Sequence, residues 1–144
     1  MAYATQADLT NVGLPAAAIV ALTNAQITAS LQSASDFADT FFRARWGQLA
    51  VPLLAWDTSV TEAVARIAAL RLLRVRGYSP KSTADQQFQL GYDEAVEWLG
   101  KVQRQQAHPL VTLALNATAP ISPLLISSSV VNLSTGRSSG NRGW

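Results

Sequence analysis

The sequence predicts a mainly α-helical protein, a small helical bundle followed by an extended, β-prone C-terminal arm. Two long segments repeat apolar residues at steps of four and three, and a third segment is apolar around most of a helix. The composition also changes abruptly after residue 106. A chain of 144 residues is long enough for one domain with its own core. We therefore expect a helical body over residues 1–106 and an interaction arm over residues 107–144.

The N-terminal region predicts two short helices. Thr5 and Asp8 have the spacing of a weak capping box and Gly13 ends the pattern, so the first helix is expected within residues 3–11. Pro15 then occupies a first helical turn, where its missing N–H costs nothing. The apolar residues that follow it continue this second helix for one or two turns.

The clearest periodic run predicts a long helix over residues 24–46. Thr23 and Gln26 have capping-box spacing before it, and Gly47 ends it. Its apolar stripe consists of Ile27, Leu31, Ala34, Ala38, Phe41 and Phe42. The polar residues expected elsewhere on this helix are Gln32, Asp36, Asp39 and Arg43. The apolar, proline-marked segment 46–56 is too short for a long helix and predicts a loop that crosses the core.

Two further helices complete the expected body. Residues 62–76 are apolar around most of the circumference, which predicts a central helix, and Gly77 is its expected C-cap. Residues 84–105 carry apolar side chains from Phe88 to Val102 at steps of four and three. They predict a second long amphipathic helix, capped by Ser82 or Thr83. We expect the two long helices to run antiparallel.

Residues 107–144 are rich in Ser, Thr, Asn, Pro and Gly and nearly free of charge. Their two β-prone stretches, Leu110–Leu115 and Leu124–Leu133, are too few to form a stable sheet alone. We therefore expect the arm to fold on a neighbouring molecule, with Trp144 as an interface anchor, a frayed tail being the alternative. The expected interface residues of the arm are Leu110, Val111, Leu113, Leu115, Leu124, Leu125, Ile126, Val130, Val131, Leu133, Arg137, Arg142 and Trp144.

The composition excludes most catalytic and metal chemistry. With no cysteine and one histidine, His108, the chain has no disulfide framework, thiolate zinc site, cysteine nucleophile or histidine cluster. The carboxylates Asp93, Glu94 and Glu97 share a helix that holds no histidine, and they predict a solvated face. The glycines do not form a phosphate-binding loop. We expect no catalytic residues, no metal, no cofactor and no enzymatic activity.

The charge distribution is more informative than the net charge of +2. Residues 107–144 contain Arg137, Arg142 and no acid, so the charges of the body balance. The arginines of the central helix are Arg66, Arg71, Arg74 and Arg76. They either pair with acids within or between subunits, or face the DNA of a channel. The alternative function is a small helical DNA-binding or regulatory module, which needs a basic exposed face.

Neither a targeting segment nor a membrane helix is expected. The N-terminus lacks a positive region before an apolar run, and no window reaches about 18 uninterrupted apolar residues. We therefore expect the protein to be made in the cytoplasm and to have no membrane partner.

The order of four segments resembles a known phage family. These segments are MAYATQADL, FFRARWGQLAVPL, TEAVARIAALRLL followed by RGYSP, and ADQQFQLGYDEAVEWLGKV. Together they resemble the head-tail connector, or adaptor, proteins of tailed bacteriophages, of the Mu-like phage and prophage type. The resemblance covers about residues 1–106. The RGW ending is similar to some connector C-termini, whereas the long arm departs from the shorter versions of the family.

The resemblance implies a non-enzymatic virion protein of the head-tail neck, assembled in the host cytoplasm. Such a protein forms a ring of roughly twelve copies between the portal and the tail or stopper. Its implied partners are further copies of itself, the portal protein, and the next neck, stopper or tail-completion protein. Packaged double-stranded DNA passes through the ring without sequence-specific binding. The arm would then add strands to one of these neighbours.

Overall fold

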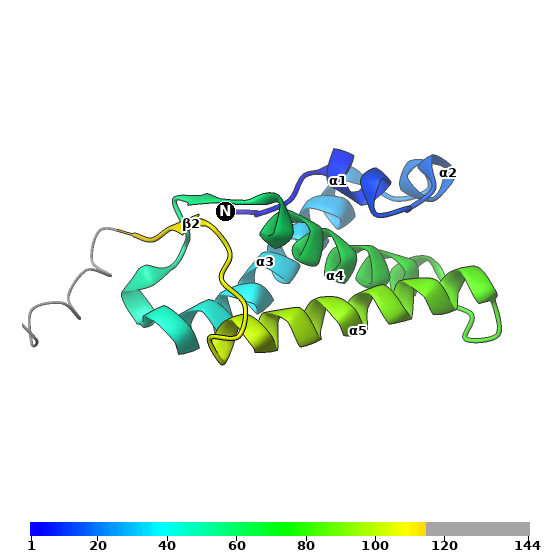
Figure 1. Ribbon diagram of the computed structural model, residues 1–144. Helices are drawn as coiled ribbons and strands as arrows, with labels where there is room; N and C mark the ends of the chain where they lie inside the picture. The colour runs from blue at the N-terminus through cyan, green and yellow to red at the C-terminus, as the bar shows by residue number, and fades with distance from the viewer. Residues whose placement is uncertain (115–144) are drawn as a thin grey trace, which may run out of the picture. The chain divides into compact units, whose positions relative to one another are not determined.

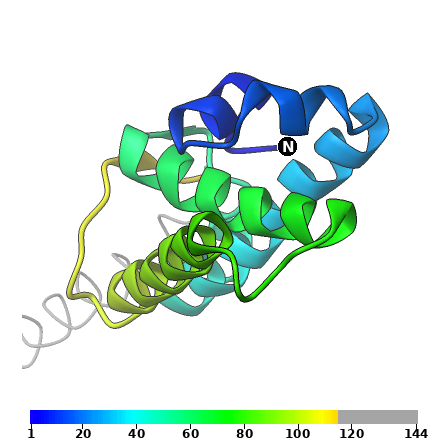
Figure 2. The same ribbon diagram turned by 90° about the vertical axis from the view of Figure 1, so that its right-hand side faces the viewer.

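Three long helices form the body of the computed structural model, which describes residues 1–114 (Figure 1). They are α3 (Asn24–Trp46), α4 (Thr58–Arg76) and α5 (Thr83–Gln103). The shorter elements are α1 (Gln6–Asn11), α2 (Ala16–Val20), the 3-10 helix η1 (Gln48–Ala50) and the strands β1 (Ala55–Trp56) and β2 (Val111–Thr112). Both views place α1 and α2 on the side of α4 opposite α5 (Figures 1 and 2). The predicted mainly helical fold is confirmed.

Local side-chain chemistry sets the helix boundaries. Thr23 caps α3: its hydroxyl accepts the Gln26 N–H at 3.2 Å, while the Gln26 side chain accepts the Thr23 N–H at 2.9 Å. Asp57 caps α4 by accepting the N–H groups of Ser59 and Val60, so this helix begins at Thr58, earlier than expected. Gly47 ends α3 with a φ of 95°, a value that a side chain would strain.

The centre of the core is α4. The inaccessible side chains of its middle turns are Val64, Ala65, Ile67, Ala68, Ala69 and Leu70. Several of these residues are alanines, and small side chains let neighbouring helices approach closely on more than one side. The expectation that this helix is central is confirmed. The stripe of α3 and the Ala95, Leu99 and Val102 side chains of α5 pack against it.

The polar side of α3 differs from the expectation in one respect. Asp39 is 93% buried, although the sequence places it outside the apolar stripe. Ser35, one helical turn earlier, is completely buried. Both side chains face Tyr3, which brings hydrogen-bonding groups into the core and so makes their burial tolerable. The prediction for Asp39 was wrong because its partner lies far away in the sequence.

The chain returns to the body after α5. Strands β1 and β2 pair antiparallel, with Ala55 opposite Thr112 and Trp56 opposite Val111. The Leu54 N–H donates to the Thr112 carbonyl at 2.8 Å, and the Ala114 N–H donates to the Ala50 carbonyl at 3.2 Å. The compact unit therefore extends to Ala114 instead of ending at residue 106.

This return corrects the first part of the expected arm. Val111 and Leu113 pack against the core of their own chain, and only Leu110 is strongly exposed. Contacts that sequence reasoning assigned to a neighbour are intramolecular at these positions. The other expected arm residues lie outside the described residues, and they are Leu115, Leu124, Leu125, Ile126, Val130, Val131, Leu133, Arg137, Arg142 and Trp144.

Within residues 1–114, no helix combines the length and the apolar character that crossing a bilayer requires.

Candidate functional site

Arg66 joins α4 to α5 through two ion pairs. Its Nη2 lies 2.6 Å from Oε1 of Glu62, one turn earlier on α4, and its Nη1 lies 2.6 Å from Oε2 of Glu94 on α5. All three side chains are at least one-third exposed, so each pair stabilises the fold by at most about 1 kcal/mol. Pairing within the body, one of the two interpretations of these arginines, holds for Arg66.

Two other arginines of α4 also contact neighbouring helices. Arg71 donates to the Ser33 hydroxyl on α3, and its guanidinium lies 5.5 Å from the centroid of the Phe37 ring. Arg74 donates to the Gln89 side chain on α5 at 3.2 Å and lies 6.0 Å from the Tyr92 ring centroid. Arg71 therefore contacts α3, whereas Arg66 and Arg74 contact α5.

Arg76, the fourth arginine, is exposed in the last turn of α4. Three of the four arginines thus contact neighbouring helices, Arg66 and Arg74 on α5 and Arg71 on α3.

Three neighbouring carboxylates of α5 each contact a different side chain. Glu94 pairs with Arg66, Asp93 accepts a hydrogen bond from Gln89 at 3.1 Å, and Glu97 pairs with Lys101 at 2.9 Å. The hydrogen bond and charge of Lys101 lower the pKa of Glu97 below its ordinary value. Across the described part of the chain, no three His, Cys, Asp or Glu side chains gather as metal ligands would.

A shallow hollow of about 250 Å³ lies between α4 and α5. Its floor contains Ala63 and Ala95, whose small side chains leave the space, and the half-buried Trp98. The triad Glu62, Arg66 and Glu94 stands at its rim.

A second hollow, of about 340 Å³, adjoins the first at Glu62 and runs toward α1, where Asp8 and Asn11 line it. The two hollows share Glu62 as a lining residue and follow the exposed strip of α4, one toward α5 and the other toward α1; together they are treated as one groove. We call it the acidic groove, because its lining includes Asp8, Glu62 and Glu94 but only one cation, Arg66.

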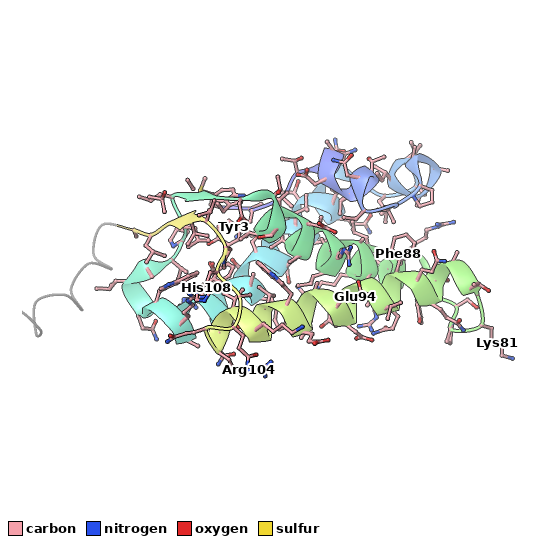
Figure 3. The ribbon with its side chains drawn as sticks, viewed as in Figure 1. Tyr3, Lys81, Phe88, Glu94, Arg104 and His108 are labelled. Carbon is pink, nitrogen blue, oxygen red and sulfur yellow. The ribbon has the colours of Figure 1, made fainter. Side chains whose placement is uncertain are left out.

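Tyr3 anchors the N-terminal segment in the core beside the start of α4 (Figure 3). Its hydroxyl donates to Oδ1 of Asp39 and accepts the Leu53 N–H at 3.0 Å. Its carbonyl accepts the Trp56 indole N–H at 3.0 Å and the Thr61 hydroxyl at 3.1 Å. One residue thereby ties α3, the 47–57 segment and α4 together.

The same environment shifts the ionisation of both members of the Tyr3–Asp39 pair. Burial, followed by the hydrogen bond to Asp39, raises the pKa of Tyr3 well above its ordinary range. Burial raises the pKa of Asp39, against the hydrogen bond from Tyr3, which lowers it. Sequence reasoning missed this cluster, whose only local signal was an aspartate one turn after a serine on α3.

Arg45 holds the turn by which the chain leaves α5. Its Nη1 donates to the carbonyls of Val102 and Ala107, at 3.0 and 2.5 Å, and its Nη2 lies 2.8 Å from Nδ1 of His108. A guanidinium only donates, so Nδ1 of His108 is the acceptor. His108 thus contacts the end of α3 as a structural side chain (Figure 3).

Asp57 fixes the next part of the return. In addition to capping α4, its Oδ2 accepts the Leu110 N–H at 2.9 Å. Partial burial raises the pKa of this carboxyl, but the hydrogen bonds from Ser59, Leu110 and Val60 outweigh it and leave the pKa below its ordinary value.

Three large apolar side chains remain exposed around the two strands. They are Leu49, Leu54 and Leu110, with 62%, 56% and 80% of their surface accessible. Backbone hydrogen bonds bring their segments together: Leu54 pairs with Thr112, and Ala50 with Ala114. We call this surface the apolar end. Neighbouring exposed leucines are typical of protein–protein contacts.

The family model described as Bacteriophage Mu, Gp36 matches residues 3–121. The chain belongs to the bacteriophage Mu Gp36 family. The match begins at the Tyr3 anchor and includes every helix and both strands of the body. No curated protein and no solved structure matches the chain. Membership in the Mu Gp36 family confirms a phage protein and indicates a structural or morphogenetic role.

Proposed function

We propose that this Mu Gp36 family member is a head-tail connector, a structural protein of the virion neck without enzymatic activity or cofactor. It forms a ring of about twelve copies between the portal and the tail or stopper. Its further partners are the portal protein and the next neck, stopper or tail-completion protein. Packaged double-stranded DNA passes through the ring without sequence-specific binding.

The observation that carries this proposal is the family match, which spans the helical body and its return segment. The surface of the body supports it. A ring contact joins two different patches of successive copies, and the exposed leucines of the apolar end are available to one of them. Arg66, Arg71 and Arg74 already contact other helices. Their engagement within the body supports a channel through which DNA passes without sequence-specific binding.

The test is deletion of the gene from the parent phage, with a plasmid copy as the control. We expect DNA-filled heads and complete tails that fail to join, and joined infectious particles when the plasmid supplies the protein. Electron microscopy of the lysates distinguishes these states. Joined, infectious particles from the deletion phage without the plasmid would contradict the connector role.

A further inference from the structure

The acidic groove has the form of a binding site for a chain segment. Its lining residues follow the exposed strip of α4, and α1 and α5 lie on opposite sides of that helix (Figure 1). Its floor combines two buried alanines with the half-buried indole of Trp98. Glu94, on its rim, lies midway along α5 (Figure 3). An aromatic side chain inserted here would contact both α4 and α5.

The rim of the groove carries unbalanced negative charge. Arg66 is shared between Glu62 and Glu94, and both glutamates keep more than half of their side-chain surface exposed. Asp8 adds a third carboxylate in the adjoining hollow. An arriving guanidinium can therefore bind a glutamate oxygen that Arg66 does not use.

The chain itself contains a segment with the complementary chemistry. Residues 115–144 include two arginines, Arg137 and Arg142, and no acid. Trp144 lies two positions after Arg142. Tryptophan and arginine are the residue types that most often anchor interfaces. Fully extended, residues 115–144 reach about 100 Å at most, so their length does not limit which groove they reach.

We propose that the segment Arg137–Trp144 of one copy binds in the acidic groove of the next copy. The arginines pair with the rim carboxylates, and the indole of Trp144 packs on the floor beside Trp98. This inference rests on the proposed ring. Segment and groove are two different patches, and such a contact repeated from copy to copy generates a ring when the rotation between copies closes.

The test is photo-cross-linking in the full chain. Two preparations, one of natural isotope content and one labelled with ¹⁵N, carry p-benzoylphenylalanine in place of Gly143, which leaves Trp144 intact. The two preparations are mixed at a dilution at which oligomers dissociate. The mixture is then concentrated so that the copies reassemble, and it is illuminated. We expect cross-links between chains of different label, from the 143 position to the tryptic peptides 46–66 or 82–101, which contain the floor of the groove beside which Trp144 packs. Links only within one label, or to other peptides, would overturn the proposal.

A matched pair of variants on α5 separates the groove from general electrostatics. Glu94→Arg reverses a groove carboxylate and is expected to reduce the yield of cross-linked dimer by about fivefold or more. Glu97→Arg makes the same charge change and also breaks one surface ion pair, but lies outside the groove, so its yield should stay at the wild-type level. Combining Glu94→Arg in one preparation with Arg142→Glu in the other should restore the yield. Equal yields from the two α5 variants would overturn the proposal.

Native mass spectrometry of the same samples tests the groove contact separately from the connector proposal. A ring without cross-links to the groove would refute the groove contact and leave the connector proposal standing. A chain that stays monomeric at every concentration, alone and with the portal, would refute both.

Discussion

At the residue scale, Tyr3 does more for the fold than its position near the N-terminus suggests. Its hydroxyl is both donor and acceptor for buried groups, and its ring contacts Phe42 and Trp56 at centroid distances of 6.1 and 4.8 Å. Buried polar groups cost most when one partner of a hydrogen bond is removed. The N-terminal segment is therefore an integral part of the body.

Tyr3→Phe tests this role. The variant keeps the ring but leaves Asp39 without its donor and the Leu53 N–H without its acceptor, so we expect the free energy of unfolding to fall by about 1–3 kcal/mol. Chemical denaturation of both proteins measures the difference. Tyr92→Phe removes a hydroxyl from a half-buried tyrosine on α5 and should change stability by less than about 0.5 kcal/mol. Equal effects of the two substitutions would contradict the role given to Tyr3.

Asp57 predicts a dependence of stability on pH. Its pKa is lower in the folded than in the unfolded state, so its contribution is complete above the unfolded value of about 3.9 and is lost as the pH falls through the folded value. Asp57→Ala should cost about 1–2 kcal/mol at neutral pH, and the cost should shrink below about pH 4. Ser82 caps α5 through a hydroxyl group instead of a carboxylate. The cost of Ser82→Ala in stability should therefore not change over this pH range. Denaturation curves from pH 7 to pH 3 measure both; a cost of Asp57→Ala that stays constant would refute the assignment.

At the scale of elements, the helices could be predicted because their signals are local. Capping residues such as Thr23 and terminating glycines such as Gly47 lie next to the helix ends that they define. The apolar period of three and four residues showed which faces are buried. The boundary of α4 was predicted too late, since its N-cap Asp57 precedes the apolar run by several residues.

The return segment could not be predicted in this way. Residues 107–114 change composition like a separate arm, but they form long-range hydrogen bonds with Arg45, Ala50, Leu54 and Asp57, more than 50 positions earlier. Long-range pairing of two-residue strands leaves no periodic pattern in the sequence. The acidic groove was missed for a similar reason, because it joins residues of α1, α4 and α5.

Arg45→Gln tests how the return segment is held. Loss of the guanidinium removes its bonds to Val102, Ala107 and His108, so we expect faster hydrogen exchange at the Leu110 and Ala114 amides. Arg43→Gln removes an exposed arginine two positions earlier on α3 and serves as the control. Exchange rates measured by mass spectrometry or NMR should rise only in the first variant. Unchanged rates in Arg45→Gln would show that the strands hold the segment without it.

At the scale of the whole molecule, the body is helical and well packed, and its exposed apolar surface includes the apolar end. Within residues 1–114, every buried side-chain polar atom has a hydrogen-bond partner, as is usual in a native core. The apolar end agrees with an assembly protein of the Mu Gp36 family.

A triple substitution of the apolar end, Leu49→Ser, Leu54→Ser and Leu110→Ser, separates assembly from folding. These leucines are mostly exposed, so the free energy of unfolding of the monomer should change by less than about 1 kcal/mol. Association between copies should weaken by tenfold or more if the leucines lie in the ring contact, at roughly 1.4 kcal/mol per factor of ten. Analytical ultracentrifugation measures the association. A variant that assembles like the wild type would place the contact elsewhere.

The most direct test of the connector account is native mass spectrometry of the full chain over a concentration series, alone and with assembled portal protein. A connector is expected to form a closed oligomer near twelve copies, either free or bound to the portal. A chain that remains monomeric in both series, with no mass added to the portal, would contradict it.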